Sequence, residues 1–214
     1  MWGLIHKDLF LLRKTVLGSL AIGTFISLAV LRTGAAGMIV ISTSAITYTF
    51  MVTALYLEEK NNSLSFLKLL PLPAVRIVDA KFLELGLVIL SSIVFEILLV
   101  TVASAWGLVE LDPAQLVLGA LLAVAFNGMG YGVALWLFFR LGYQKIRIGI
   151  FVFFWFIIYA LGSLVPRLKF IVEILGIGPV HPLVFFTVLL VFFAGGLSYL
   201  SWTLARWDFG RREL

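Results

Sequence analysis

Six long apolar runs, separated by short polar stretches, constrain this chain more than any other feature. A helix needs about 20 predominantly apolar residues to cross a membrane, and each run is close to that length or exceeds it. We therefore expect an all-α integral membrane protein with six transmembrane helices. The predicted spans cover approximately residues 15–31, 35–57, 83–107, 115–139, 148–165 and 182–205.

The composition agrees with this reading. Hydrophobic residues make up 62% of the chain and charged residues 13%, whereas about a quarter of a soluble domain is charged. Six spans use most of the 214 residues, which predicts a single transmembrane domain over residues 1–214 with no room for a soluble catalytic domain. The chain has no cysteine, which excludes disulfides, thiolate nucleophiles and Cys-ligated metals.

The distribution of basic residues predicts the orientation. If both termini are cytoplasmic, 13 of the 16 lysines and arginines lie on the cytoplasmic side, as the positive-inside rule requires. The predicted outer loops hold only Arg32, Arg167 and Lys169. We expect a multi-pass protein of the cell membrane, in a bacterial or archaeal inner membrane. The net charge of +5 then belongs to the cytoplasmic face and favours anionic lipid or an acidic partner over nucleic acid.

Residue types that carry enzymatic chemistry are sparse. His6 and His181 are predicted to lie on opposite sides of the membrane, so they cannot share a site. Glu58 and Glu59 lack the membrane-depth histidines that an intramembrane metalloprotease would place beside them. No hydrolase, zinc-protease or phosphate-loop motif occurs. We expect no catalytic residue, no metal site and no cofactor bound by this chain.

Glu96 is the one ionisable side chain predicted at membrane depth. A charge there costs about 2.5–3.5 kcal/mol on insertion scales. It is either a proton or cation site or a packing carboxyl with a hydrogen-bonded neighbour, for which Asn127 is a candidate. The packing role is the one we favour.

The second predicted span carries a polar stripe. Ser42, Thr49, Thr53 and Tyr56 share one helical face because they are seven, four and three residues apart. Together with Glu96 they form the candidate translocation path. The alternative is that the hydroxyls bond back to carbonyls of their own helix, and the pattern alone leaves both open.

The polar stretch between the second and third spans contains a short apolar helix. Asn62 or Ser63 can cap it, and Pro71 and Pro73 end it. One apolar face results, formed by Leu64, Leu67 and Leu70 with Phe66 beside it. A cytoplasmic helix of this kind needs either a lipid surface or a groove on another protein.

This stretch resembles the permease subunits of ABC-2 type exporters. The likeness rests on acidic residues at Glu58 and Glu59, a capped helix, a Leu-Pro-Leu-Pro at residues 70–73, and Arg76 and Lys81 entering the next span. The opening residues 7–14 are also similar to the starts of the small members. Bacterial peptide and toxin exporters are the nearest likeness, and the haem-exporter permease of cytochrome c maturation is similar in its Leu-Pro-rich loop.

The resemblance implies a permease that forms the translocation path as a dimer, with itself or with a sister permease. Each copy would bind a separate ABC ATPase subunit, which would carry the ATP and magnesium. The substrate would be a peptide or another amphipathic molecule. The ATPase-coupling residues would be Glu58, Glu59, Asn62, Ser63, Leu64, Phe66, Leu67, Leu70 and Pro71. The alternative is a stand-alone secondary transporter or channel that uses Glu96 as its ion site.

Overall fold

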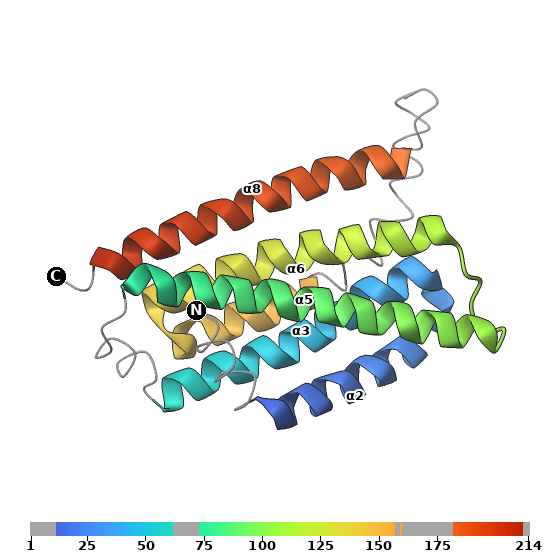
Figure 1. Cartoon of the computed structure of the whole chain (residues 1–214), viewed down its shortest axis with the longest axis horizontal. Helices are drawn as coiled ribbons and strands as arrows, with labels where there is room; N and C mark the ends of the chain where they lie inside the picture. Colours follow the sequence, from blue (N-terminus) through green and yellow to red (C-terminus); the bar gives the residue numbers. More distant parts are fainter. Residues whose placement is uncertain (1–11, 62–72, 157–158, 160–181, 212–214) are drawn as a thin grey trace.

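The chain folds into a bundle of long helices. A computed structural model describes residues 12–61, 73–156, 159 and 182–211, and Figure 1 shows the helices running roughly side by side. None of the described residues belongs to a strand, which confirms the predicted all-α class. The elements are α2 (Arg13–Ala29), the short 3-10 helix η1 (Leu31–Thr33), α3 (Gly34–Lys60), α5 (Ala74–Ala105), α6 (Pro113–Leu141), a helix over residues 143–156, and α8 (Pro182–Gly210).

Four of the described helices are long and apolar enough to cross a membrane. These segments are Leu31–Lys60, Val75–Ala105, Pro113–Leu141 and Thr187–Gly210. The apolar part of α2, Thr15–Ala29, is shorter. Several membrane-crossing helices therefore make this a multi-pass membrane protein, while the count of six spans and the side on which the termini lie remain predictions.

The turns between helices have clear local causes. The side chain of Asp112 accepts a hydrogen bond from the Ala114 amide at 2.9 Å, and Pro113 occupies the first turn of α6, a combination that favours a helix start. Gly142 ends α6 with a φ of 83°, a conformation that glycine adopts at little cost. The chain can therefore reverse at once into the helix over residues 143–156.

α5 starts earlier than the predicted third span. It begins at Ala74, directly after the extended residue Pro73, whereas the apolar run was placed from residue 83. Its 32 residues correspond to about 48 Å at 1.5 Å per residue, longer than the hydrocarbon core of about 30 Å. The first turns of α5 carry charged residues, which lower the local hydropathy. A span predicted from hydropathy therefore begins later than the helix does.

α3 is the central helix. Its apolar segment is 72% buried, and it packs against α2, α5 and α6, while α8 lies along α6 (Figure 1). The contact between α3 and α6 is close at Gly119, where an added Cβ would lie 2.9 Å from the Ala36 Cα. Only a glycine permits this approach of the two backbones.

The outward faces of the peripheral helices are apolar. Phe25 of α2 is 74% exposed and Phe192 of α8 is 78% exposed, and large aliphatic side chains line the outer face of α5. Such a surface is far more apolar than a soluble monomer presents. It fits a bundle surrounded by lipid or by a second membrane subunit.

Candidate functional site

A buried polar cluster joins three helices in the middle of the bundle. Ser27 of α2 donates its hydroxyl hydrogen to the Glu96 Oε2 of α5 at 2.5 Å, and its oxygen lies 2.8 Å from the Ser42 hydroxyl of α3. All three side chains are buried. Because one hydroxyl hydrogen serves one strong acceptor, Ser42 is the donor to Ser27 in this arrangement. The structure therefore brings together two of the predicted path residues, Ser42 and Glu96, and adds Ser27, which the sequence pattern did not single out.

Glycine makes room beside Glu96. A Cβ added to Gly23 of α2 would lie 2.5 Å from the Ile46 side chain and 3.2 Å from the Glu96 Oε1. This second carboxyl oxygen is buried, and no described residue hydrogen-bonds to it. The missing Cβ at Gly23 lets α2 approach closely enough for Ser27 to reach the carboxyl.

Asn127 does not form the contact with Glu96 that we considered from the sequence. Its side-chain amide donates instead to the Ala123 carbonyl at 2.7 Å and to the Ser44 hydroxyl at 3.2 Å. Ser44 lies on α3, so Asn127 links α6 to α3. The central helix is thus held by separate polar contacts on two sides.

The rest of the polar stripe behaves differently from Ser42. Thr49 donates to the Ala45 carbonyl at 2.9 Å, and Thr53 donates to the Thr49 carbonyl at 2.8 Å. Tyr56 is 46% exposed, and its ring meets that of Tyr143 edge-on at 6.0 Å. The hydroxyls of Thr49 and Thr53 therefore bond within their own helix, the arrangement that the sequence had left open.

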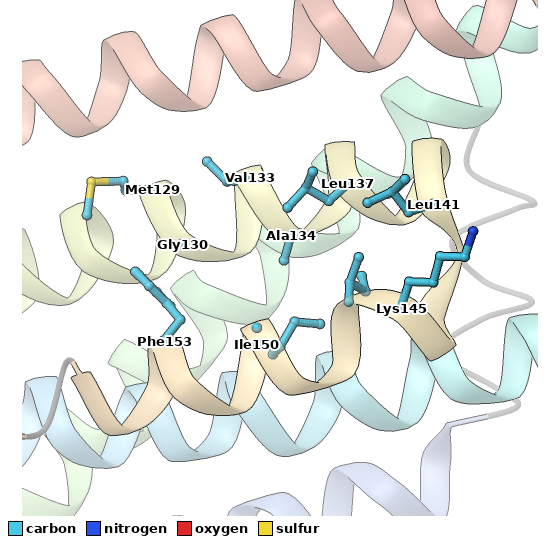
Figure 2. A pocket seen from close by; sticks show the side chains of 11 residues that line it. Met129, Gly130, Val133, Ala134, Leu137, Leu141, Lys145, Ile150 and Phe153 are labelled. Atoms are coloured by element: carbon cyan, nitrogen blue, oxygen red, sulfur yellow. The ribbon is translucent and has the colours of Figure 1, made fainter.

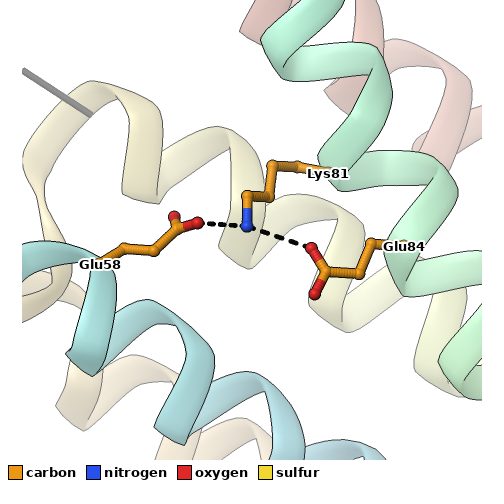
Figure 3. A network of polar contacts seen from close by, with 3 residues as sticks. All are labelled: Glu58, Lys81 and Glu84. Carbon is orange, nitrogen blue, oxygen red and sulfur yellow. Dashed lines mark hydrogen bonds and ion pairs between the residues drawn. The ribbon is translucent and has the colours of Figure 1, made fainter. Parts of the chain in front are cut away.

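A second cluster lies where α3 ends and α5 begins. The Lys81 ammonium pairs with Glu58 of α3 and, at 3.1 Å, with Glu84 one turn further along α5 (Figure 3). None of the three side chains is more than 7% exposed. Buried charges persist only when they are paired and hydrogen-bonded, so this cluster fixes the end of α3 against α5.

Glu59, the neighbour of Glu58, caps another helix. Its Oε2 accepts hydrogen bonds from the backbone amides of Tyr143 and, at 3.2 Å, Gln144. Those amides begin the helix over residues 143–156 and have no partner within it. A carboxylate at this position also interacts favourably with the helix dipole. Burial raises the pKa of the Tyr143 phenol.

The same end of the bundle is tied to α8. Asp79 of α5 accepts from the Trp202 indole at 2.8 Å and pairs with the Arg206 guanidinium at 3.1 Å. Asp208 accepts from the indole of Trp136 on α6 at 2.9 Å. We call this end, where α3, α6 and α8 finish and α5 begins, the charged end of the bundle.

The predicted coupling residues divide into two sets. Glu58 and Glu59 lie in the described part of the chain, where both have partners on other helices, and their coupling role stays a prediction. The remaining predicted coupling residues lie outside the described part of the chain; they are Asn62, Ser63, Leu64, Phe66, Leu67, Leu70 and Pro71. Both described sides of this segment, residues 61 and 73, lie at the charged end.

Lys81, Glu84 and Asp79 are the contact residues that sequence reasoning missed. Their signal was present as charged residues directly before a long apolar run, with Lys81 and Glu84 three residues apart on one helical face. The third span was predicted to begin at residue 83, so Asp79 and Lys81 fell in the polar stretch before it and Glu84 fell at its start.

Comparison with known proteins gives a single result. No curated protein and no solved structure matches the chain. A family model described as "ABC-2 family transporter protein" matches residues 3–205, nearly the entire length. This match agrees with the all-helical bundle and its membrane-crossing helices, and the chain therefore belongs to the ABC-2 family of transporter proteins.

Proposed function

We propose that this chain is the permease subunit of an exporter driven by a separate ABC ATPase, and that it forms the translocation path as a dimer in the cell membrane. The ATPase holds the ATP and magnesium, and this chain supplies no catalytic group. The substrate class that fits best is a peptide or another amphipathic molecule. The proposal rests on the family match over residues 3–205, which supports a membrane permease.

The geometry of the charged end supports a coupling role for the segment between α3 and α5. Glu58 and Lys81 pair α3 with α5 close to the two sides of that segment. Breaking a buried ion pair by removing one partner costs about 3–5 kcal/mol. A force applied to residues 62–72 therefore moves α3 and α5 together and does not merely unwind their ends.

Glu59 extends this connection to a third helix. Because its carboxylate caps the helix over residues 143–156, a displacement of the α3 end also displaces that helix. In this proposal Glu59 acts as an internal link between α3 and the helix over residues 143–156.

The alternative function, a stand-alone ion-coupled transporter using Glu96, has weaker support. Glu96 has a hydroxyl partner, Ser27, which fits the packing role. The carboxyl is thus better explained as a contact between α2 and α5.

The first test is complex formation with a candidate ABC ATPase. Leu67→Asp replaces an apolar side chain of the predicted coupling helix, and Leu108→Asp is the control, since Leu108 is exposed in the turn at the opposite end of the bundle. Burial of a leucine contributes about 1.5–3 kcal/mol, so Leu67→Asp should weaken the complex at least about tenfold. The measurement is co-purification together with the rate of ATP hydrolysis.

The control variant should bind and stimulate the ATPase as the original chain does. An intact and fully active complex with Leu67→Asp would mean that residues 62–72 do not contact the ATPase. In that case an interfacial lipid-binding helix would be the better account of this segment.

A further inference from the structure

An apolar groove lies between α6 and the helix over residues 143–156. Its volume is about 440 Å³, and apolar residues of both helices line it, among them Val133, Leu137 and Ile150 (Figure 2). At the inner end the Phe153 ring lies directly against Gly130, where an added Cβ would overlap it. The groove is therefore closed at one end by an aromatic ring.

The other end of the groove carries a positive charge. Lys145 lies beside Leu141 at the charged end of the bundle (Figure 2) and is exposed. In the described part of the chain Lys145 forms no ion pair. The acid at the start of this helix, Glu59, accepts hydrogen bonds from the Tyr143 and Gln144 amides. The mouth of the groove is thus suited to an anion.

The length of the groove matches one leaflet of a bilayer. It extends along α6 from Met129 to Leu141, which is about 18 Å at 1.5 Å per residue. Half of the hydrocarbon core measures about 15 Å. A single acyl chain entering beside Lys145 would reach the Phe153 ring near the middle of the membrane.

We propose that this groove binds an anionic phospholipid, with one acyl chain between the two helices and the headgroup phosphate at Lys145. The dimensions account for the acyl chain, and the lysine at the mouth accounts for the preference for negative charge. A second copy of this chain would also bury the apolar lining, but it would leave the cation at the mouth without a role. The lipid would fill the space beside the helix that Glu59 caps.

Gly149 allows the groove to be filled without disturbing the fold. It lines the groove, and no heavy atom lies within 4 Å of an added Cβ. A leucine there would occupy the space of the acyl chain. Gly86 of α5 also has open space around an added Cβ and lies away from the groove, so Gly86→Leu is the matched control.

The experiment is native mass spectrometry of the full chain, titrated with dioleoylphosphatidylglycerol or with dioleoylphosphatidylcholine. These two lipids share their acyl chains and differ in headgroup charge. We expect about a fivefold preference for the anionic lipid, the effect of one basic residue near a membrane surface. Lys145→Gln should remove this preference, while Arg76→Gln, on the exposed start of α5, should keep it.

Filling the groove should have a different effect from removing the charge. Gly149→Leu should lower the affinity for both lipids about tenfold, and Gly86→Leu should lower neither. Val133→Phe fills the same groove from α6 and is to be used if Gly149→Leu does not fold. Equal binding of the two lipids by the original chain would overturn the proposal, as would unchanged binding in both Lys145→Gln and Gly149→Leu. If Gly149→Leu leaves lipid binding intact but converts a dimer to a monomer, the groove is instead an interface between two copies.

Discussion

Hydroxyl groups that donate hydrogen bonds in the described part of this bundle fall into two kinds, according to whether the acceptor lies on the same helix or on another. Ser92 and Thr53 donate to carbonyls one turn earlier in their own helices. Ser27 instead reaches Glu96 on another helix. Only the second kind ties helices together, because a bond within one helix is kept when that helix moves as a unit. The polar contacts that hold the bundle are therefore few and specific.

Ser27→Ala should destabilise the protein more than Ser92→Ala. Both serines are 2% exposed, so the loss of volume and burial is matched. Removing the Ser27 hydroxyl leaves the Glu96 carboxyl without its donor, and such contacts within membranes contribute about 0.6–2 kcal/mol. The measurement is the thermal unfolding midpoint in one detergent. Equal midpoints for the two variants would contradict a stabilising role for the Ser27–Glu96 contact.

The ends of α3 and α5 are joined by charge, whereas their middle parts are joined by apolar packing. Further from the charged end, Phe50 of α3 and Val88 and Ile89 of α5 belong to the buried hydrophobic core. Glu58, Lys81 and Glu84 add a paired cluster at the charged end. Ion pairs are directional, so they fix the register of the two helices in a way that interchangeable apolar side chains do not. This is the connection on which the proposed coupling depends.

Lys81→Met should destabilise the chain strongly, by about 3–5 kcal/mol in the free energy of unfolding, because it removes the cation that pairs with two buried carboxylates, Glu58 and Glu84. Lys60→Met is the control, since Lys60 is exposed at the same end. Adding Glu58→Gln and Glu84→Gln to Lys81→Met should restore part of the loss by removing the two buried negative charges that Lys81 balanced. The measurement is again the thermal midpoint. A triple variant no more stable than Lys81→Met would show that packing of the lysine chain, and not charge, matters here.

At the scale of the whole molecule, the bundle has two chemically different ends. The described basic residues gather at the charged end, with Arg32 at the opposite end. The turn over residues 106–112 lies at the end away from the C-terminus (Figure 1) and holds two acids, Glu110 and Asp112. The fold thus brings together in space the basic residues that the sequence predicts on one side of the membrane.

The chain without cysteine permits a direct test of orientation. Asn61→Cys and Glu110→Cys place single thiols at opposite ends of the bundle, both at exposed positions. We expect a membrane-impermeant maleimide to label Glu110→Cys in intact cells, and Asn61→Cys only after the cells are opened. This follows from the bias of lysine and arginine toward the cytoplasm. Labelling of Asn61→Cys in intact cells would reverse the predicted topology.

Hydropathy and motif content were sufficient to predict the class of this protein and its family. Long apolar runs require helices because a membrane offers no hydrogen-bond partner to the backbone. The turn after Arg32 coincides with Gly34, and the helix end near residue 140 coincides with Arg140 and Gly142. The family match over residues 3–205 confirms the ABC-2 resemblance read from residues 1–14 and 58–84. These features are local in the sequence, so no tertiary information was needed to find them.

Only the tertiary structure decided which polar residues meet. Glu58 and Lys81 are separated by the whole predicted coupling segment, and Glu59 caps a helix that begins at Tyr143, far along the chain. Nothing in the sequence distinguishes Ser27 from the other serines, and its contact with Glu96 arises only from the packing of α2 against α5. A hydropathy average over a window counts each charged residue as unfavourable for membrane insertion. Within a bundle, a charged side chain is stable when an oppositely charged partner from another helix lies within a few ångströms. For that reason the sequence alone determined the all-helical membrane class and the family, and the packing of the helices decided the internal contacts of Glu58 and Glu59.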